Sequence, residues 1–136
     1  MGRLLGIDYG DVRIGLALSD PLKIIASPFK TIRNKNFELL MDTLSQIIFE
    51  KEVEALVLGL PLSLKNQDTK QTKKVRVFAE SIKILKRPIY LQDERLSSIS
   101  AKKSLIKQEI KTGFNKDMVD DTAAAIFLQQ FIDTSR

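Results

Sequence analysis

Residues 55–58 limit the possible folds more than any other segment of the chain. They form a continuous apolar run that is closed by Gly59 and Pro61. A strand that is apolar on both of its faces must be covered on both, which is typical of parallel strands in α/β proteins. We therefore expect a sheet with helices on each side.

The rest of the chain supplies elements that complete such a sheet. Residues 4–8 and 13–19 are apolar stretches separated by Gly10, and they predict a β-hairpin. A third strand is expected at 27–32 and a further one at 88–91. Apolar residues recur at helical spacing from Asn36 to about residue 51 and from 75 to 85, with a loop at 64–71 before the second helix. Two more helices are expected, at 97–113, where Ser97 is the cap, and from 115–117 to 132.

Three strands followed by strands that alternate with helices predict an α/β fold with a mixed five-stranded sheet and helices on both faces. A chain of 136 residues suits a single domain, residues 1–136. Periodicity alone leaves several α/β folds open.

Composition limits the catalytic chemistry that the chain can use. The chain has no cysteine and no histidine, so a thiol nucleophile, a Ser-His-Asp triad and imidazole ligands are excluded. Any hydrolysis must rely on carboxylates. A net charge of +5 favours a polyanionic partner without identifying one. With no apolar segment long enough for a signal peptide or a membrane span, we expect a soluble cytoplasmic protein that does not bind membranes.

Two acidic positions follow predicted strands, where α/β proteins tend to bind ligands. Asp8 ends the first strand between two glycines, although an Asp beside Gly also suits a simple turn. Asp93 and Glu94 follow the strand at 88–91. Because neighbouring strand residues point to opposite faces, only one of the pair should face a site. The alternative is that this pair is the acidic N-terminus of the next helix.

A third acidic position is the start of the last helix, where Asp120 and Asp121 precede three alanines. Small residues let a helix approach a sheet closely, which could bring a carboxylate beside Asp8. Acidic residues are also common in first helical turns because of the helix dipole.

The segments 6–10, 13–20, 58–62, 93–97 and 119–120, with the alanine-rich helix, resemble the signature blocks of the YqgF (RuvX) family in order and spacing. This family of the RNase H-like superfamily comprises pre-16S rRNA processing and Holliday-junction-resolvase-like proteins. The resemblance implies an RNase H-like fold and a nuclease whose catalytic residues are Asp8, Glu94 and Asp120. These three, with Asp93, would hold Mg²⁺ or Mn²⁺. It also places Arg13 and Arg95 near that site. The loop at 63–70 departs from the family, which usually has glycine there.

Basic residues are concentrated in two regions. Phosphate contacts need such a distribution, although any single lysine is better explained by a solvated helix face. With few aromatic residues and none interleaved with the basic ones, no stacking surface is predicted, and recognition should depend on backbone and shape. The candidates for nucleic-acid binding are Arg13, Lys65, Lys73, Lys74, Arg95, Lys102, Lys103 and Lys107.

The resulting hypothesis is a metal-dependent endonuclease that processes the 5′ end of pre-16S rRNA in ribosome biogenesis, in contact with ribosomal particles. One alternative is a Holliday junction resolvase that acts on branched DNA, which would need a two-fold dimer. Another is a non-catalytic nucleic-acid-binding ribosome-assembly factor. Because every apolar helix stripe is needed for the core, a monomer is expected.

Overall fold

The computed structural model describes residues 2–63, 65, 67–94 and 117–135, and it describes side chains in the last helix from residue 122 onward. Its strands are β1 (Arg3–Asp8), β2 (Arg13–Ser19), β3 (Ala26–Arg33), β4 (Val53–Leu60) and β5 (Ile89–Asp93). Its helices are α1 (Phe37–Glu50), α2 (Lys70–Ser81), the 3₁₀ helix η1 (Ile82–Leu85) and α4 (Asp117–Thr134). The helix expected at 97–113 lies outside the described residues.

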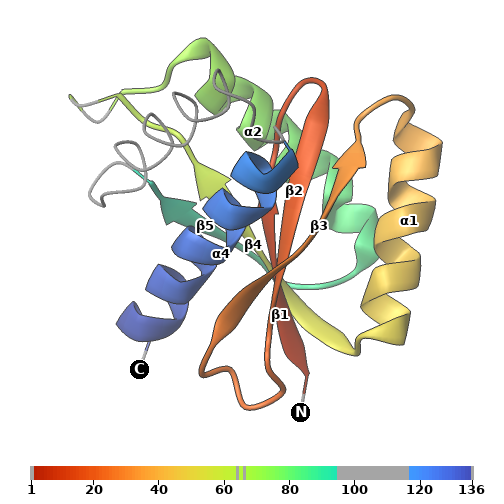
Figure 1. The fold of residues 1–136 in the computed structure, drawn as a ribbon. Helices are drawn as coiled ribbons and strands as arrows, with labels where there is room; N and C mark the ends of the chain where they lie inside the picture. The colour runs from red at the N-terminus through yellow and green to blue at the C-terminus, as the bar shows by residue number, and fades with distance from the viewer. Residues whose placement is uncertain (1, 64, 66, 95–116, 136) are drawn as a thin grey trace.

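The strands form a mixed sheet of five, in the order β3-β2-β1-β4-β5. The first three strands pair antiparallel, whereas β4 pairs parallel with both β1 and β5. The α4 helix covers one face, and α1, α2 and η1 cover the other (Figure 1). Residues 55–58 of β4 are buried on both faces. The predicted mixed sheet between helical layers is confirmed.

The α2 helix begins earlier than its apolar pattern predicts. Its first turn is polar, and the apolar side chains that face the core start only at Val75. The beginning is set instead by Thr69, whose hydroxyl caps the helix and pairs with Thr72 in a reciprocal capping box. The expectation that residues 70 and 71 belong to a loop is therefore wrong. The later part of the predicted helix, from Ile82, is the separate 3₁₀ helix η1.

The α4 helix packs closely against the sheet at two glycines. A Cβ on Gly6 would lie 3.1 Å from the Ala124 carbonyl oxygen, and one on Gly59 would lie 2.6 Å from the Phe127 ring. Ala124 and Phe127 are fully buried. Glycine in the strands and alanine in the helix thus allow the close approach that the alanine-rich sequence predicts.

Apolar side chains also remain on the surface of the helices. Phe37, Leu39 and Phe49 on α1 and Val77 on α2 are exposed. The apolar stripes expected for α1 and α2 do pack in the core, apart from Phe37, and these exposed side chains lie beside them as apolar surface that the core does not use. Among the described residues, no helix is long and apolar enough to cross a membrane.

Candidate active site at the sheet edge

One edge of the sheet collects the ends of several strands. The parallel strands β1, β4 and β5 all end there, and β2, which is antiparallel to β1, begins there. Asp8 is the last residue of β1. Asp93 is the last residue of β5 rather than the first residue after it, because it still pairs with Leu60 of β4. Both acidic positions therefore lie at this edge, as the sequence predicts.

Strand alternation places Asp8 on the face that α4 covers. Gly6, two residues earlier, faces Ala124 and Leu128 of α4. Leu4, two residues before that, belongs to the same buried cluster as α4. Side chains two apart in a strand share a face. Asp8 thus follows Leu4 and Gly6 toward α4.

The register of β5 separates Asp93 from Glu94. Gly59 of β4 faces the α4 residue Phe127, and its partner in β5 is Gln92. Glu94 continues the pairing, since its backbone N–H donates to the Leu60 carbonyl at 3.2 Å. Gln92 therefore lies on the α4 face and Asp93 on the opposite face, and continued alternation would put Glu94, the first residue after β5, on the α4 face.

Glu94 is also the more enclosed member of the pair. Only 6% of its surface is exposed, whereas Asp93 is half-buried. A buried carboxylate is costly unless it is paired or binds a cation. Both Asp8 and Glu94 have interaction partners in the structure. Of the pair, Glu94 is the buried carboxylate, and Asp93 lies on the face opposite to Asp8.

Asp120 belongs to the first part of α4, which starts at the same edge. The helix runs antiparallel to β1, because Ala124 lies by Gly6 while Ile132, nearer the helix end, lines a cavity with Leu4. The side chain of Asp120 is outside those described. Within the described residues, no three acidic, histidine or cysteine side chains form a group that could hold a metal ion. The three-carboxylate cluster stays a prediction.

The candidate basic residues fall in different places. Arg13 begins β2 and, by alternation with the buried Ala17 in the α4-side cluster, lies on the same face as Asp8. Lys65 is exposed in the loop after β4, and Lys73 and Lys74 are exposed on α2. Lys74 forms an ion pair with Asp11 at 3.0 Å. The remaining candidates lie outside the described residues: Arg95, Lys102, Lys103 and Lys107.

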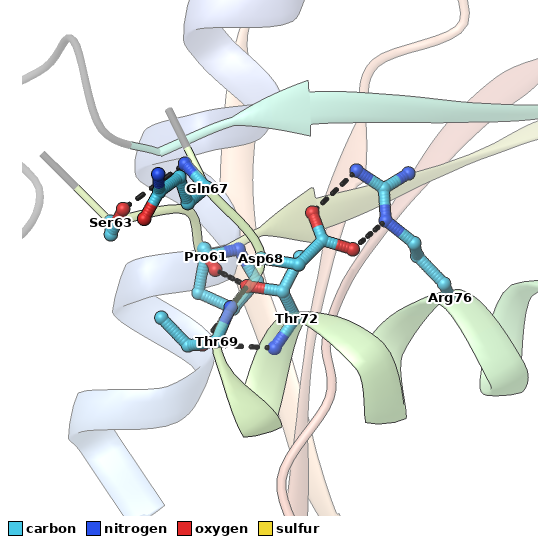
Figure 2. A network of polar contacts seen from close by, with 7 residues as sticks. All are labelled: Pro61, Ser63, Gln67, Asp68, Thr69, Thr72 and Arg76. Atoms are coloured by element: carbon cyan, nitrogen blue, oxygen red, sulfur yellow. Dashed lines mark hydrogen bonds and ion pairs between the residues drawn. The ribbon is translucent and has the colours of Figure 1, made fainter. Parts of the chain in front are cut away.

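The loop between β4 and α2, which lacks the family's glycine, is held by side chains (Figure 2). The fully buried Thr72 donates its hydroxyl proton to the Pro61 carbonyl. Asp68 accepts two hydrogen bonds from Arg76, at 2.8 and 3.0 Å. Arg76 thereby holds the pKa of Asp68 below its usual value, and Asp68 raises the pKa of Arg76.

These contacts connect the loop to the site. Thr72 holds Pro61, and the carbonyl of the preceding Leu60 accepts the Glu94 N–H. Sequence reasoning missed Thr72 as a structural residue. The signal was present, because two threonines three apart at Thr69 and Thr72 match the spacing of a capping box.

A mixed five-stranded sheet in the order β3-β2-β1-β4-β5 between helical layers, with Asp8 and Glu94 at one edge, defines a protein of the RNase H-like fold class. The chain matches the model of one family, RuvX, described as Holliday junction resolvase, over residues 2–134. The chain belongs to this family.

Curated relatives carry the name "Putative pre-16S rRNA nuclease". One from Zymomonas mobilis is 41% identical over 98% of this chain and 82% of its own length. One from Desulforamulus reducens is 40% identical over 97% of each chain. Family and relatives assign the chain to the nucleases, so the predicted enzyme class is confirmed.

Solved structures support the fold. Thermus thermophilus RuvC in complex with a Holliday junction substrate has a TM-score of 0.61 and 14% identity, covering 99% of this chain and 96% of its own. The Fowlpox virus resolvase with junction DNA has a TM-score of 0.54 and 7% identity, covering 98% of each chain. The RNase H-like fold is thus confirmed.

Proposed function

We propose that this chain is a metal-dependent endonuclease that processes the 5′ end of pre-16S rRNA, and that Asp8, Glu94 and Asp120 form its active site. The observation that supports the proposal is that Asp8 ends β1 on the α4 side of the sheet edge where α4 begins, and that the buried Glu94 directly follows β5 at the same edge. Asp120 precedes Ala124 by four residues, and helical residues four apart share a face. This spacing favours a position for Asp120 toward the same edge.

The side chains at this edge suit a hard divalent cation. The chain has neither cysteine nor histidine, so its candidate ligands are all carboxylate oxygens, which Mg²⁺ and Mn²⁺ prefer. When bound, either ion would neutralise charge on the scissile phosphate and favour deprotonation of the attacking water. The role of Asp8, Glu94 and Asp120 is to hold that ion and orient the water. Arg13, on the same face, would contact a phosphate of the strand.

The sequence relatives favour RNA as the substrate. Relatives that share about 40% of their residues with this chain over nearly its whole length are named for pre-16S rRNA, whereas the junction-bound structures share 14% or less. Cutting one strand of a precursor needs a single site, while symmetric junction cleavage needs two. We therefore propose a monomer that acts on ribosomal particles in the cytoplasm.

The test is a cleavage assay with labelled pre-16S RNA and a mobile four-way junction, each with and without Mn²⁺. We expect Mn²⁺-dependent single cuts in the RNA, and none with Asp8→Asn, which preserves shape but removes a charged ligand. Paired symmetric nicks in the junction with an intact RNA would identify a resolvase. Binding of RNA without cleavage under any condition would identify the non-catalytic assembly factor.

A further inference from the structure

A groove of about 520 Å³ opens on the face of the sheet opposite α4, between α1, α2 and the end of β1. Its apolar floor and walls come from segments far apart in the sequence. The Tyr9 and Phe78 rings lie in contact, with centroids 4.4 Å apart. The apolar lining consists of Tyr9, Phe37, Leu40, Val77 and Phe78, and the polar rim consists of Asn34, Lys73, Lys74 and Ser81.

The groove has a fixed floor and open walls. Leu40 and Phe78 are buried in the main core cluster, whereas Phe37 is 47% exposed and Val77 is 69% exposed. Apolar surface that faces solvent in a concave site is typical of a ligand site. The sequence alone predicts no stacking surface, because its aromatic residues are scattered. The fold brings three of them together.

The groove adjoins the candidate active site. Tyr9 directly follows Asp8, and it packs against the core cluster on the α1 and α2 side. The first half of α2 is tied to the turn after β1. Gln71 donates to the Tyr9 carbonyl at 3.3 Å, and Lys74 pairs with Asp11. A strand whose phosphate lies at Asp8 would reach the groove by crossing this edge.

The rim identifies the chemistry of the occupant. Lys73 and Lys74 stand beside the aromatic lining, Lys70 lies one turn earlier on the same helix, and Lys74 pairs with Asp11, while the described lining of the groove itself includes no carboxylate. An apolar peptide or a second copy of this chain would gain little from this surplus of positive charge. A nucleotide presents a flat base for the aromatic lining and a phosphate for the lysines.

We propose that this groove binds one unpaired base of the RNA strand, next to the scissile position, with a neighbouring phosphate at Lys73 and Lys74. The inference rests on the proposed function and specifies its substrate: the strand must carry an unpaired nucleotide beside the cut. A base within a continuous duplex cannot enter the groove.

The test measures binding by fluorescence anisotropy in the Asp8→Asn background, so that cleavage does not interfere. The probe is an unpaired RNA oligonucleotide from the 5′ leader of 16S rRNA. We expect Phe37→Ala to bind this RNA on the order of ten-fold more weakly, the effect typical of losing one base-stacking contact. Phe49→Ala is the matched control, because Phe49 is an exposed phenylalanine on the same helix outside the groove. It should bind like the parent.

A scan with single abasic sites identifies the base that enters. One abasic position should weaken binding to the parent by a similar factor and have no further effect on Phe37→Ala. A fully paired RNA should bind both proteins equally. Val77→Glu, at a position exposed enough to tolerate the change, should repeat the loss by repelling the phosphate.

Two results would overturn the inference. One is equal binding of the unpaired RNA by Phe37→Ala and Phe49→Ala. The proposed function would survive this result if the wild type still cuts pre-16S RNA with Mn²⁺. The other is a wild-type dimer in sedimentation that Phe37→Ala converts to a monomer, which would make a second copy the occupant. If the parent binds no RNA, the proposed function and this inference fail together.

Discussion

Gly59→Ala tests how α4 is seated on the sheet. The new Cβ would lie 2.6 Å from Cε2, 2.9 Å from Cδ2 and 3.0 Å from Cζ of Phe127. Carbon atoms in good contact lie about 3.5–4.0 Å apart, so the ring must move by about 1 Å. Phe127 is fully buried among α4 and sheet residues and has little room to move. Such overpacking typically costs about 1–3 kcal/mol.

For a domain of this size, that loss corresponds to a fall in Tm of roughly 3–12 °C. Thermal and urea unfolding, followed by circular dichroism, would measure it. Phe127→Leu in the same chain should remove the collision, so the double variant should be less destabilised than the sum of the two single variants. An unchanged Tm for Gly59→Ala, or strictly additive effects, would refute the close seating of α4.

Three further predictions concern the loops and the basic surface. The pKa of Asp20 is lowered because its carboxylate accepts hydrogen bonds from the Ile25 and Ile24 backbone N–H groups. This stabilisation is present above the ordinary aspartate pKa of about 4 and is lost as the pH falls through the lowered pKa of the folded state. Asp20→Asn should therefore lower Tm at pH 7, and the difference in Tm between variant and wild type should disappear in acid. Equal Tm values at pH 7 would contradict this. Thr72→Val should cost about 1–3 kcal/mol in urea unfolding, because the Pro61 carbonyl loses its buried donor, and Thr72→Ser should recover most of it. Replacing Lys73 and Lys74 together by Gln should reduce the salt dependence of single-stranded RNA binding by about 1.4 in log–log slope, and an unchanged slope would show that these lysines contact no phosphate.

Much of the fold could be predicted because local patterns and tertiary packing agree in it. The apolar run at 55–58 predicted a strand that is buried on both faces, and β4 is buried on both faces. The helical pattern predicted from Asn36 corresponds to α1, which begins at Phe37 with Asn36 as its cap. The pattern failed at the start of α2, where the first turn is polar, although Thr72 within it is fully buried. There, side-chain hydrogen bonds of Thr69 and Thr72 determine where the helix begins, and such bonds cannot be detected from hydrophobic periodicity.

The candidate site needed the register as well as the sequence. Adjacent acidic residues cannot be told apart by composition. The pairing of Leu60 with Asp93 is what puts Asp93 on the face opposite to Asp8. The groove was beyond prediction, because Tyr9 and Phe78 meet only when α2 folds back over the end of β1.

In the proposed metal site, Glu94 rather than its neighbour Asp93 joins Asp8. Titration calorimetry with Mn²⁺ tests this assignment, using as a matched pair Glu94→Gln and Asp93→Asn, which each remove one charge at adjacent positions at the end of β5. We predict that Glu94→Gln binds Mn²⁺ at least roughly ten-fold more weakly than the wild type, while Asp93→Asn binds it nearly unchanged. Loss of binding in Asp93→Asn with normal binding in Glu94→Gln would show that Asp93, and not Glu94, is the ligand.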